Sequence, residues 1–453
     1  DTFVAYPGEK SDGRTFIPQA IARGASAVLW EPANFKWQDD WAIANQPLPQ
    51  LREKLGFLAN EVYGLPSHYL WVIGVTGTNG KTSCAHWLGQ ALTKLGRKTA
   101  IIGTLGNGFY GELAPTANTT PDAITLHAQL RAFLEQGARA VAMEVSSHGL
   151  VQGRVNGVAF DVAILTNLSR DHLDFHGSMQ AYENAKAMLF SWPELRYAIL
   201  NRDDALGLKL SQHLNSDAKI ITYGIAEGDV HCSALQVNAQ GIKFDAVTPQ
   251  GKAPIVSPLL GAFNVYNLLA TLSALLASGI DLQSAARALA QLEPVPGRMQ
   301  KIGAANQALV VIDYAHTPDA LEKVLISLKE LLPARGRLIC VFGCGGERDH
   351  GKRPMMGEVA TRLASLTILT SDNPRSENPR AIIDEIISGA SGNYQIIEDR
   401  AQAIQQAIRL ANSNDIVLIA GKGHESYQEI AGVKLPFDDA TVAKMALARG
   451  VTL

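Results

Sequence analysis

Short apolar segments separated by helical stretches run through the middle of the chain. Segments with the length and residue types of buried strands cover residues 69–75, 99–102, 140–144, 162–166, 198–201 and 219–222. A glycine-rich turn follows the first segment, and residues 81–95 then repeat apolar positions with helical spacing. Strands that alternate with helices are typical of a parallel sheet joined by crossover helices. We therefore expect a central domain built on a parallel sheet.

The regions on both sides of this segment have their own patterns. Before it, residues 3–5 and 27–30 are predicted strands, and residues 16–23 are a predicted helix. After it, residues 236–255 indicate hairpins and residues 264–292 indicate helices. Further apolar strands, most of them separated by helices, follow at residues 309–313, 338–342, 366–370, 395–397 and 416–420. This last pattern predicts a second α/β layer domain.

A proline and glycine cluster, Pro294-Val295-Pro296-Gly297, marks a domain boundary and is either a hinge or a rigid connector. The prediction is an α/β fold of three domains: a small N-terminal α/β domain (1–67), a central P-loop ATPase-type domain with a parallel sheet (68–297), and a C-terminal Rossmann-like domain (298–453). At roughly 150 residues per domain, the length of 453 residues agrees with three. The chain starts inside a predicted strand without an initiator Met, so we expect an upstream segment.

The composition narrows the class of protein. Hydrophobic residues make up 47% and charged residues 18%, which is typical of a soluble globular chain. Lys and Arg number 40 against 43 Asp and Glu, so bulk charge gives no reason to expect nucleic acid or a membrane surface as a partner. No apolar run approaches the roughly 20 residues that a membrane-spanning helix needs. The unpatterned Cys84, Cys232, Cys340 and Cys344 suit a reducing compartment, and we expect a cytoplasmic monomer.

The strongest chemical signal is the turn Gly74-Val75-Thr76-Gly77-Thr78-Asn79-Gly80-Lys81-Thr82 between a strand and a helix. Glycines let the backbone approach phosphate oxygens, and free amide groups at a helix start favour anions. Lys81 is expected to reach the outer phosphates and Thr82 to bind Mg²⁺, although Val75 replaces the first glycine of the general motif. The turn predicts a nucleoside triphosphate site formed by Gly77, Thr78, Asn79, Gly80, Lys81, Thr82 and Ser83.

Polar residues also follow two later strands. Glu144 ends the strand 140–144 and is placed to reach Mg²⁺ from a neighbouring strand tip. Residues 167–176 gather polar groups just after another strand, where open α/β sheets place their sites. His172 and His176 lie four residues apart, as zinc ligands on one helical face do, but no cysteine or carboxylate pattern of zinc type accompanies them. An ordinary hydrogen-bonded role stays open for each histidine.

Eight motifs follow one another along the chain. They are residues 77–82, Asn118-Thr119-Thr120, residues 144–149, residues 166–174, Gly261-Ala262-Phe263-Asn264, Gly297-Arg298-Met299, residues 313–318 and Gly421-Lys422-Gly423-His424-Glu425. Together they resemble the Mur ligases, ATP-dependent amide-forming enzymes that extend the peptide on UDP-N-acetylmuramic acid in peptidoglycan synthesis. The resemblance covers essentially the whole chain. It implies domains for the nucleotide-sugar, for ATP and for the amino acid, with closure that excludes water.

The segment Asp372-Asn373-Pro374-Arg375 is similar to a motif of Mur ligases that add meso-diaminopimelate. This amino acid carries a second amino-acid head, and a planar guanidinium such as that of Arg375 binds a carboxylate bidentately. A turn that starts the next helix is the alternative, and Asn378-Pro379-Arg380 has that form. The resemblance adds Arg348, Gly421 and Glu425 as further amino-acid contacts, and a solvated carboxylate is the alternative for Glu425.

The resemblance also implies contacts to nucleotide and metal ions. It assigns Thr82 and Glu144 to one Mg²⁺ and His172 to a second metal ion. Lys186 matches the lysine that the family carbamylates into a carboxylate-like ligand. Because carbamylation needs an unprotonated amine, we expect Lys186 to be buried or near cations. The implied ATP contacts are Asn264, which can also be a helix cap, Arg298, which can also form a boundary salt bridge, Asp313 and His316.

The UDP-muramoyl dipeptide has its own implied contacts, namely Glu9, Lys10, Ser11, Asn118, Thr119, Thr120, Ser146, Gln152 and Arg154. Thr119 and Thr120 can equally be turn residues. The segment 8–13 matches the family in position but only weakly in residue identity. Two residues that usually hold the uracil in this family lie before Asp1.

The implied reaction joins meso-diaminopimelate to UDP-N-acetylmuramoyl-L-alanyl-D-glutamate. The D-glutamate carboxylate attacks the γ-phosphate of ATP, and the amine then attacks the acyl phosphate and expels phosphate. The expected catalytic residues are Lys81, Glu144, His172 and Lys186, with Mg²⁺ as cofactor. A lysine-adding ligase, a folylpolyglutamate synthase and a nucleotide-dependent switch are the alternatives. Arg375 argues against the first, the short unit before residue 69 against the second, and the switch leaves His172 and Lys186 without a purpose.

Overall fold

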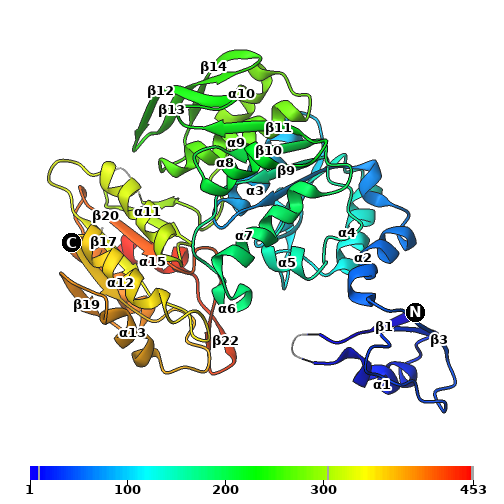
Figure 1. The fold of residues 1–453 in the computed structure, drawn as a ribbon. Coiled ribbons are helices and arrows are strands. Elements are labelled where there is room, and N and C mark those ends of the chain that lie inside the picture. The colour runs from blue at the N-terminus through cyan, green and yellow to red at the C-terminus, as the bar shows by residue number, and fades with distance from the viewer. Residues whose placement is uncertain (9–10, 304–305, 450–453) are drawn as a thin grey trace.

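The computed structural model describes residues 1–8, 11–303 and 306–449, which fold around three separate sheets (Figure 1). A three-stranded sheet comes first, an 11-stranded sheet forms the middle, and a six-stranded sheet and a two-stranded hairpin follow. The predicted α/β class with three α/β units is confirmed, while the domain limits at residues 67 and 297 stay predictions. Among the described residues, no helix is both long enough and apolar enough to cross a membrane.

The first sheet is small and parallel. Its strands are β1 (Thr2–Ala5), β2 (Ala27–Trp30) and β3 (Ala44–Pro47), with a 3₁₀ turn over Gly13–Phe16 and α1 (Ile17–Ala22) packed on them. A core of Ala5, Ile17, Val28 and Trp30 holds this unit together. Sequence analysis missed β3 because its residues Ala-Asn-Gln-Pro are all exposed and lack an apolar face.

Helix α2 (Leu51–Val62) leaves this sheet and packs on α4 (Ala123–Glu135) of the middle unit. Gly56 makes the approach possible, because a Cβ atom at that position would lie 2.1 Å from the carbonyl oxygen of Asn156. The N-terminal unit is therefore joined to the middle unit by a packed helix.

The middle sheet has the strand order β14-β13-β12-β11-β10-β9-β4-β8-β5-β6-β7. Its strands are β4 (Trp71–Thr76), β5 (Thr99–Gly103), β6 (Gly106–Phe109), β7 (Glu112–Ala114), β8 (Ala140–Glu144), β9 (Val162–Leu165), β10 (Tyr197–Asn201), β11 (Lys219–Gly224), β12 (Val230–Asn238), β13 (Gly241–Thr248) and β14 (Gly251–Ser257). All six strands predicted for the parallel part are present, and β12 to β14 form the predicted hairpins. The short antiparallel strands β6 and β7 were not predicted.

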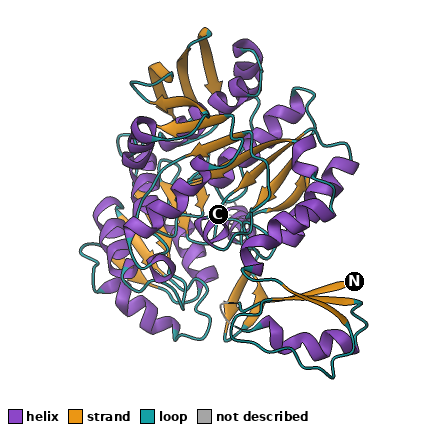
Figure 2. Cartoon of the chain, turned by 45° about the vertical axis from the view of Figure 1, so that its right-hand side comes forward, coloured by secondary structure: helices purple, strands orange, loops and turns teal. Residues whose placement is uncertain are grey.

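Helices cover both faces of this sheet (Figure 2). On one face lie α3 (Lys81–Lys94), α9 (Phe263–Ala277) and α10 (Leu282–Ala290). On the other face lie α4, α5 (Ser147–Val151) and α8 (Ala205–His213). The remaining elements are the 3₁₀ turns Pro66–Tyr69 and Met188–Ser191 and the helices α6 (Leu173–His176) and α7 (Met179–Ala187).

The third sheet has the order β15-β16-β20-β17-β18-β19 and is parallel except for β15. Its strands are β15 (Gln300–Ile302), β16 (Leu309–Asp313), β17 (Leu338–Phe342), β18 (Leu366–Leu369), β19 (Tyr394–Ile396) and β20 (Ile416–Ala420). Helices α11 (Pro318–Glu330), α12 (Lys352–Leu363) and α13 (Pro379–Ile387) pack on one face, and α14 (Arg400–Leu410) and α15 (Asp439–Arg449) on the other. This layered arrangement confirms the predicted Rossmann-like unit. The unpredicted hairpin β21 (Tyr427–Ile430) and β22 (Val433–Pro436) follows β20.

The predicted boundary cluster is packed against the third unit. Gly297 adopts a left-handed φ of +67°, and a Cβ atom there would lie 2.2 Å from the backbone nitrogen of His424 in the loop after β20. This position needs glycine both for its backbone conformation and for space. The connector is thus in close contact with the third unit, and its role as a hinge stays a prediction.

Burial of His86 on α3 makes stability depend on pH. The side chain is 3% exposed, Nε2 has no hydrogen-bond partner among the described residues, and burial lowers the pKa to about 4. Because this pKa is below its unfolded value of 6.5, the unfolded chain takes up the proton first, and stability present above pH 6.5 is lost as pH falls toward 4.

We predict that His86→Gln weakens this pH dependence. Between pH 7.5 and 5.0 the wild-type protein loses on the order of 1–2 kcal/mol through this histidine, so its Tm falls by a few degrees more than that of His86→Gln. Thermal unfolding at both pH values measures the difference, with the exposed His213→Gln as the control. An equal change of Tm with pH in His86→Gln and in His213→Gln would contradict the prediction.

Candidate active site

Three parallel strands bring the predicted motifs to one edge of the middle sheet. Strand β4 lies between β8 and β9, so the residues after all three strands meet at their carboxyl ends. The turn after β4 ends at Gly80, with φ of +88°, and α3 begins at Lys81. At Gly77, with φ of +144°, a Cβ atom would lie 1.9 Å from Thr166 Oγ1. The two glycines are therefore required for the tight turn that was predicted to bind phosphate.

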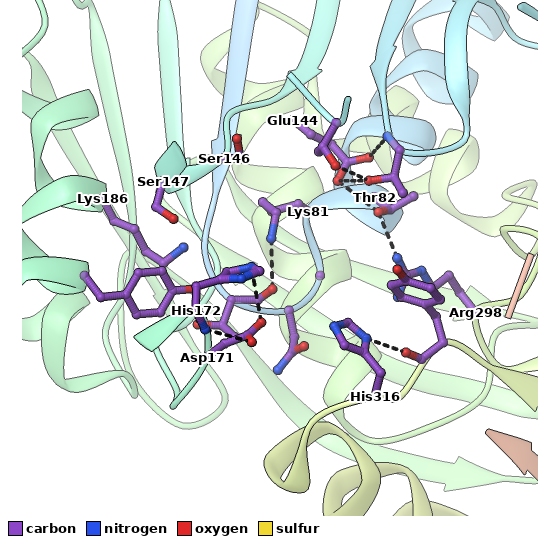
Figure 3. A pocket seen from close by; sticks show the side chains of 17 residues that line it. Lys81, Thr82, Glu144, Ser146, Ser147, Asp171, His172, Lys186, Arg298 and His316 are labelled. Carbon is purple, nitrogen blue, oxygen red and sulfur yellow. Dashed lines mark hydrogen bonds and ion pairs between the residues drawn. The ribbon is translucent and has the colours of Figure 1, made fainter. Parts of the chain in front are cut away.

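A polar cavity of about 160 Å³ opens beside this turn (Figure 3). It brings together most of the predicted phosphate and metal residues and some from the third unit. Its lining residues are Thr78, Asn79, Gly80, Lys81, Thr82, Thr104, Thr119, Glu144, Ser146, Ser147, Asp171, His172, Tyr182, Lys186, Arg298, Tyr314 and His316.

Lys81 points back over the turn. Its Nζ donates hydrogen bonds to the carbonyl oxygens of Gly77, at 2.8 Å, and Thr78, at 2.9 Å. Burial lowers the pKa of this ammonium, while Glu144 acts in the opposite direction. A half-buried cation bonded only to neutral carbonyls is well placed to gain a stronger, anionic partner such as a phosphate oxygen.

Glu144 is held in one orientation by several donors. Its Oε2 accepts from Thr82 Oγ1 at 3.0 Å, its Oε1 accepts from the backbone nitrogen of Thr104 at 2.8 Å, and the residue is 1% exposed. Arg298 reaches from the third unit and donates to Thr82 Oγ1 at 3.1 Å. Thr82 and Glu144 therefore lie in contact, and their predicted role as ligands of one Mg²⁺ stays a prediction.

Lys186 on α7 is buried, as the sequence analysis expected. Its Nζ donates to the carbonyl oxygen of Gly77 at 2.8 Å and lies 4.3 Å from the centre of the Tyr182 ring. Burial lowers the pKa of Lys186 well below its usual value, and the nearby charge of Lys81 lowers it further. Within the part of the chain that the structure describes, Lys186 forms no ion pair. These surroundings favour the neutral amine.

The two predicted histidines after β9 have different partners. His172 lines the cavity, with Nε2 at 3.4 Å from Asp171 Oδ2, and burial lowers the pKa of its imidazole. His176 instead shares a hydrogen bond of 2.9 Å with Ser147 Oγ. No group of three or more His, Cys, Asp or Glu side chains among the described residues forms a metal site. The zinc interpretation of His172 and His176 therefore has no support.

A second, larger cavity of about 560 Å³ adjoins the first between the middle and third units. The two cavities share Asn79, Gly80, Thr82, Arg298 and Tyr314. The walls of the larger cavity are less polar. They come from α9, α11 and the segments near them, and include Ile225, Ala262, Phe263, Tyr266, Ala320 and Val324. A polar cavity at the phosphate turn and a more apolar one beside it can hold the two ends of a nucleotide.

The predicted nucleotide contacts line these cavities. Asn264 is not the cap of α9, because its amide donates to the carbonyl oxygen of Leu260 and accepts from Asn267. Arg298 stacks at 4.5 Å on the ring of Tyr314 and pairs with no acid among the described residues, so the boundary salt bridge is wrong. Both carboxylate oxygens of Asp313 accept backbone N–H groups, and burial raises its pKa.

His316 lies at the small cavity. Its Nδ1 is 2.9 Å from the carbonyl oxygen of Tyr314, so Nδ1 carries the proton and Nε2 is an acceptor. Burial lowers its pKa to about 4, which keeps the ring neutral at pH 7.

The predicted dipeptide contacts only partly converge. Thr119 and Ser146 line the small cavity, and the hydroxyl of buried Thr120 bonds to Ser146. Arg154 donates to the carbonyl oxygen of Thr120, and Gln152 ends α5 next to this group. Asn118 and Ser11 are exposed, while Glu9 and Lys10 lie outside the described residues. The structure therefore brings Thr119, Thr120, Ser146 and Arg154 together and leaves Ser11 on the separate N-terminal unit.

The predicted amino-acid contacts gather around the loop after β18. Arg375 has a left-handed φ of +53° and donates from Nη1 to the carbonyl oxygen of Gly346 at 2.6 Å, and its Nε lies 3.4 Å from Glu429 Oε2. Asn373 donates to Glu425 Oε2 at 2.7 Å. The other members are Asp372, Pro374, Gly421, where a Cβ atom would lie 2.6 Å from Asp372, and the exposed Arg348.

The second copy of the triplet differs from the first. Asn378 is the N-cap of α13, its side chain accepts from the backbone nitrogens of Arg380 and Ala381, and Pro379 starts the helix. The prediction that this copy only starts a helix is confirmed. Asp372 to Arg375 starts no helix, so a helix-starting turn does not explain this first copy.

Three family models match the chain in order. They are the Mur ligase family catalytic domain over residues 1–63, the Mur ligase middle domain over 75–275, and the Mur ligase glutamate ligase domain over 297–423. A relative from Chromobacterium violaceum is 53% identical over 450 residues, covering 99% of this chain and 91% of the relative. The chain belongs to the Mur ligase family.

Two further comparisons support the membership. The relative from Chromobacterium violaceum and one from Nitrosomonas europaea, 51% identical over 99% of this chain and 90% of its own, are both named UDP-N-acetylmuramoyl-L-alanyl-D-glutamate–2,6-diaminopimelate ligase. A solved structure with the same name is 39% identical and covers 100% of this chain and 93% of its own, with a TM-score of 0.71. The Mur ligase fold predicted from the motifs is therefore confirmed.

The donors in the small cavity fit Mg²⁺ when other ligands complete the set. Thr82 and Glu144 offer hard oxygen atoms 3.0 Å apart, which is the ligand type that Mg²⁺ prefers. Mg²⁺ in proteins commonly takes one or two carboxylates and leaves its other positions to phosphates and water. The Mur ligase turn beside these residues is where such phosphates are expected.

Some cavity residues were missed by the sequence analysis. Thr104 follows β5 and contacts Glu144 through both its backbone nitrogen and its hydroxyl. Because functional residues of such sheets follow strand ends, Thr104 could have been predicted from the sequence. Tyr182 lies one helical turn before Lys186 and bonds to Thr78 at 3.2 Å. Tyr314, which lies in the motif of residues 313–318, packs under Arg298. An aromatic residue gives no sequence signal for such a supporting role.

We predict that Gly103→Ala weakens Mg²⁺-dependent nucleotide binding. Gly103 has no positive φ, but a Cβ atom there would lie 2.2 Å from Glu144 Oε1 and must push the carboxylate aside. Displacing one ligand should lower the affinity for an ATP analogue with Mg²⁺ by about 10-fold or more. Titration calorimetry with Mg²⁺ and with excess chelator measures this. The same loss under both conditions would show that Glu144 does not act through the metal.

Proposed function

We propose that this Mur ligase family member joins meso-diaminopimelate to UDP-N-acetylmuramoyl-L-alanyl-D-glutamate with cleavage of ATP to ADP and phosphate. The observation that supports it most is the 53% identity, over 99% of the chain, to a ligase named for this reaction. The two adjoining cavities, with Lys81 lining the smaller one, and the Arg375 loop in the third unit agree with it. Such a reaction belongs to peptidoglycan precursor synthesis in the cytoplasm.

Phosphoryl transfer needs positioning and compensation of negative charge more than a protein nucleophile. The larger cavity would hold the nucleoside, and the turn would hold the phosphates with the ammonium of Lys81 on the outer ones. Arg298 adds a second cation from the third unit. Bound Mg²⁺, held by Thr82 and Glu144 and at a second position by His172 and carbamylated Lys186, would supply charge stabilisation.

The D-glutamate carboxylate of the acceptor would enter beside Thr119, Ser146 and Lys186 and attack the γ-phosphorus, which forms the acyl phosphate and releases ADP. The acyl phosphate then reacts with the amine of diaminopimelate, an amide bond forms, phosphate leaves and the amine loses a proton. His316 carries an acceptor nitrogen at the cavity but is neutral, so it adds no charge. Contact between the middle and third units would protect the acyl phosphate from water.

The third unit would select the amine. Nη2 of Arg375 donates to no partner among the described residues and is available to the far carboxylate of diaminopimelate, while Glu425 is available to the far ammonium. Lysine lacks that carboxylate, so a lysine-adding ligase gains nothing from Arg375. Phosphate release from ATP with the acceptor and meso-diaminopimelate, L-lysine or no amine tests the proposal. Release that ignores both acceptor and amine would instead support a nucleotide-dependent switch.

We predict that Arg375→Ala reduces the preference for meso-diaminopimelate over L-lysine. Loss of a charged hydrogen-bond pair corresponds to about 10- to 100-fold in the ratio of kcat/KM values, with little change for L-lysine. The control is Arg380→Ala, which removes an exposed arginine of the helix-starting triplet paired with Asp384. An undiminished preference in Arg375→Ala would refute the substrate assignment.

We predict that Lys186→Ala is nearly inactive and is partly rescued by acetate or propionate. A neutral amine and CO₂ give a carbamate and a proton, and a short carboxylate can take the place of that carbamate in the space left by the side chain. Steady-state rates with and without added carboxylate measure this. Lys209→Ala, which removes an exposed lysine paired with Glu183, is the matched control. A fully active Lys186→Ala would remove the carbamate from the mechanism.

A further inference from the structure

A fully buried lysine lies behind the proposed amine-binding loop. Lys422, in the turn after β20, is 0% exposed, although lysine is among the residue types least often buried. It follows Gly421, a residue expected to contact the amino acid, but Lys422 itself has no role in the proposed reaction. Burying an ammonium is costly unless charge and hydrogen bonds compensate it. Its partners therefore show what the charge does.

Lys422 Nζ has two side-chain partners, both in the proposed amine site. It donates to Asn373 Oδ1 at 3.0 Å and to Glu425 Oε2 at 3.0 Å. The two partners are also bonded to each other, because Asn373 Nδ2 donates to Glu425 Oε2 at 2.7 Å. The three side chains form a closed triangle of hydrogen bonds that includes one ion pair.

The triangle leaves little freedom to the amide of Asn373. Its Oδ1 accepts from Lys422 and also from the backbone nitrogen of Glu429 at 2.9 Å. Since the opposite end of the amide donates to Glu425, a flip would lose all of these bonds. The charge of Lys422 thus fixes which end of Asn373 faces Glu425.

Through Glu429 the same triangle reaches Arg375. The backbone oxygen of Glu429 accepts a hydrogen bond from the backbone nitrogen of Arg375 at 3.0 Å. The carboxylate of Glu429 lies 3.4 Å from Arg375 Nε. Strand β21, which carries Glu429, thereby holds the 372–375 loop in place. At the other corner, Glu425 uses only Oε2 for protein partners among the described residues, which leaves Oε1 for a cation.

We propose that Lys422 is a positioning residue that orients Glu425, Asn373 and, through β21, Arg375 to receive the far amino-acid head of the amine substrate. The inference rests on the proposed function, and it adds a charged residue that does not touch the substrate. One carboxylate oxygen is neutralised by Lys422 so that the other points at a substrate ammonium, while Arg375 stays aimed at the neighbouring carboxylate.

The test compares Lys422→Met, which keeps most of the volume and removes the charge, with Lys434→Met. Lys434 is the matched control because it lies 4.3 Å from the ring of Tyr427, the same ring that Lys422 approaches at 5.6 Å, but is exposed on β22. We expect Lys422→Met to raise KM for meso-diaminopimelate about 10- to 100-fold. KM for ATP and for the UDP-muramoyl dipeptide should stay within about twofold, and kcat at saturating amine near wild type.

Lys422→Gln keeps a hydrogen-bond donor without the charge and should raise the KM for meso-diaminopimelate by a smaller factor. This variant serves as the test if Lys422→Met does not fold. An unchanged KM for meso-diaminopimelate in a folded Lys422→Met, or an equal rise in all three KM values, would overturn the proposal. Failure of the proposed function would look different, because the wild-type enzyme would then show no amine-dependent phosphate release.

Discussion

Two lysine nitrogens share a single carbonyl oxygen at the centre of this molecule. The Nζ atoms of Lys81 and Lys186 both lie 2.8 Å from the oxygen of Gly77; Lys186 is buried and Lys81 is half-buried. Neither has a carboxylate within ion-pair distance among the described residues, because Glu144 is turned toward Thr82 and Thr104. Keeping two unpaired ammonium groups this close together costs free energy. The site therefore favours the neutral form of one amine and an anionic ligand for the other.

The third unit completes this centre. Arg298 donates to Thr82, and Asn79 of the phosphate turn donates to Asp319 at the start of α11 at 3.2 Å. A looser ion pair of 3.8 Å joins Arg170 and Asp349. Residues of α9 and α11 face each other across the larger cavity at this junction. The phosphate turn alone thus provides a binding element, and the third unit adds a second wall to the site.

The parallel strands were predictable because a strand buried on both faces reads as a continuous apolar run. The strands that were missed, β3, β6, β7, β15, β21 and β22, are short or lie at edges, where polar and glycine residues remove that signal. In the site, the phosphate turn and Glu144 follow strand ends and were found locally. Thr104 also follows a strand end, although the sequence analysis overlooked it. Tyr182 and Lys422 carry no such signal, because a ring or an ammonium acquires its role from residues distant in sequence.

One physical rule, the cost of burying charge, explains the opposite arrangements at the two ends of the site. At the phosphate turn, Lys81, Lys186 and Arg298 form no ion pair among the described residues, which favours a ligand that brings negative charge. At the amine loop, Lys422 meets Glu425 and Arg375 meets Glu429, so charges are paired one to one. A paired set has little net charge, and it favours a ligand head that carries both signs over one that carries a single sign. The electrostatics of the protein therefore match a triphosphate at one end and a zwitterion at the other.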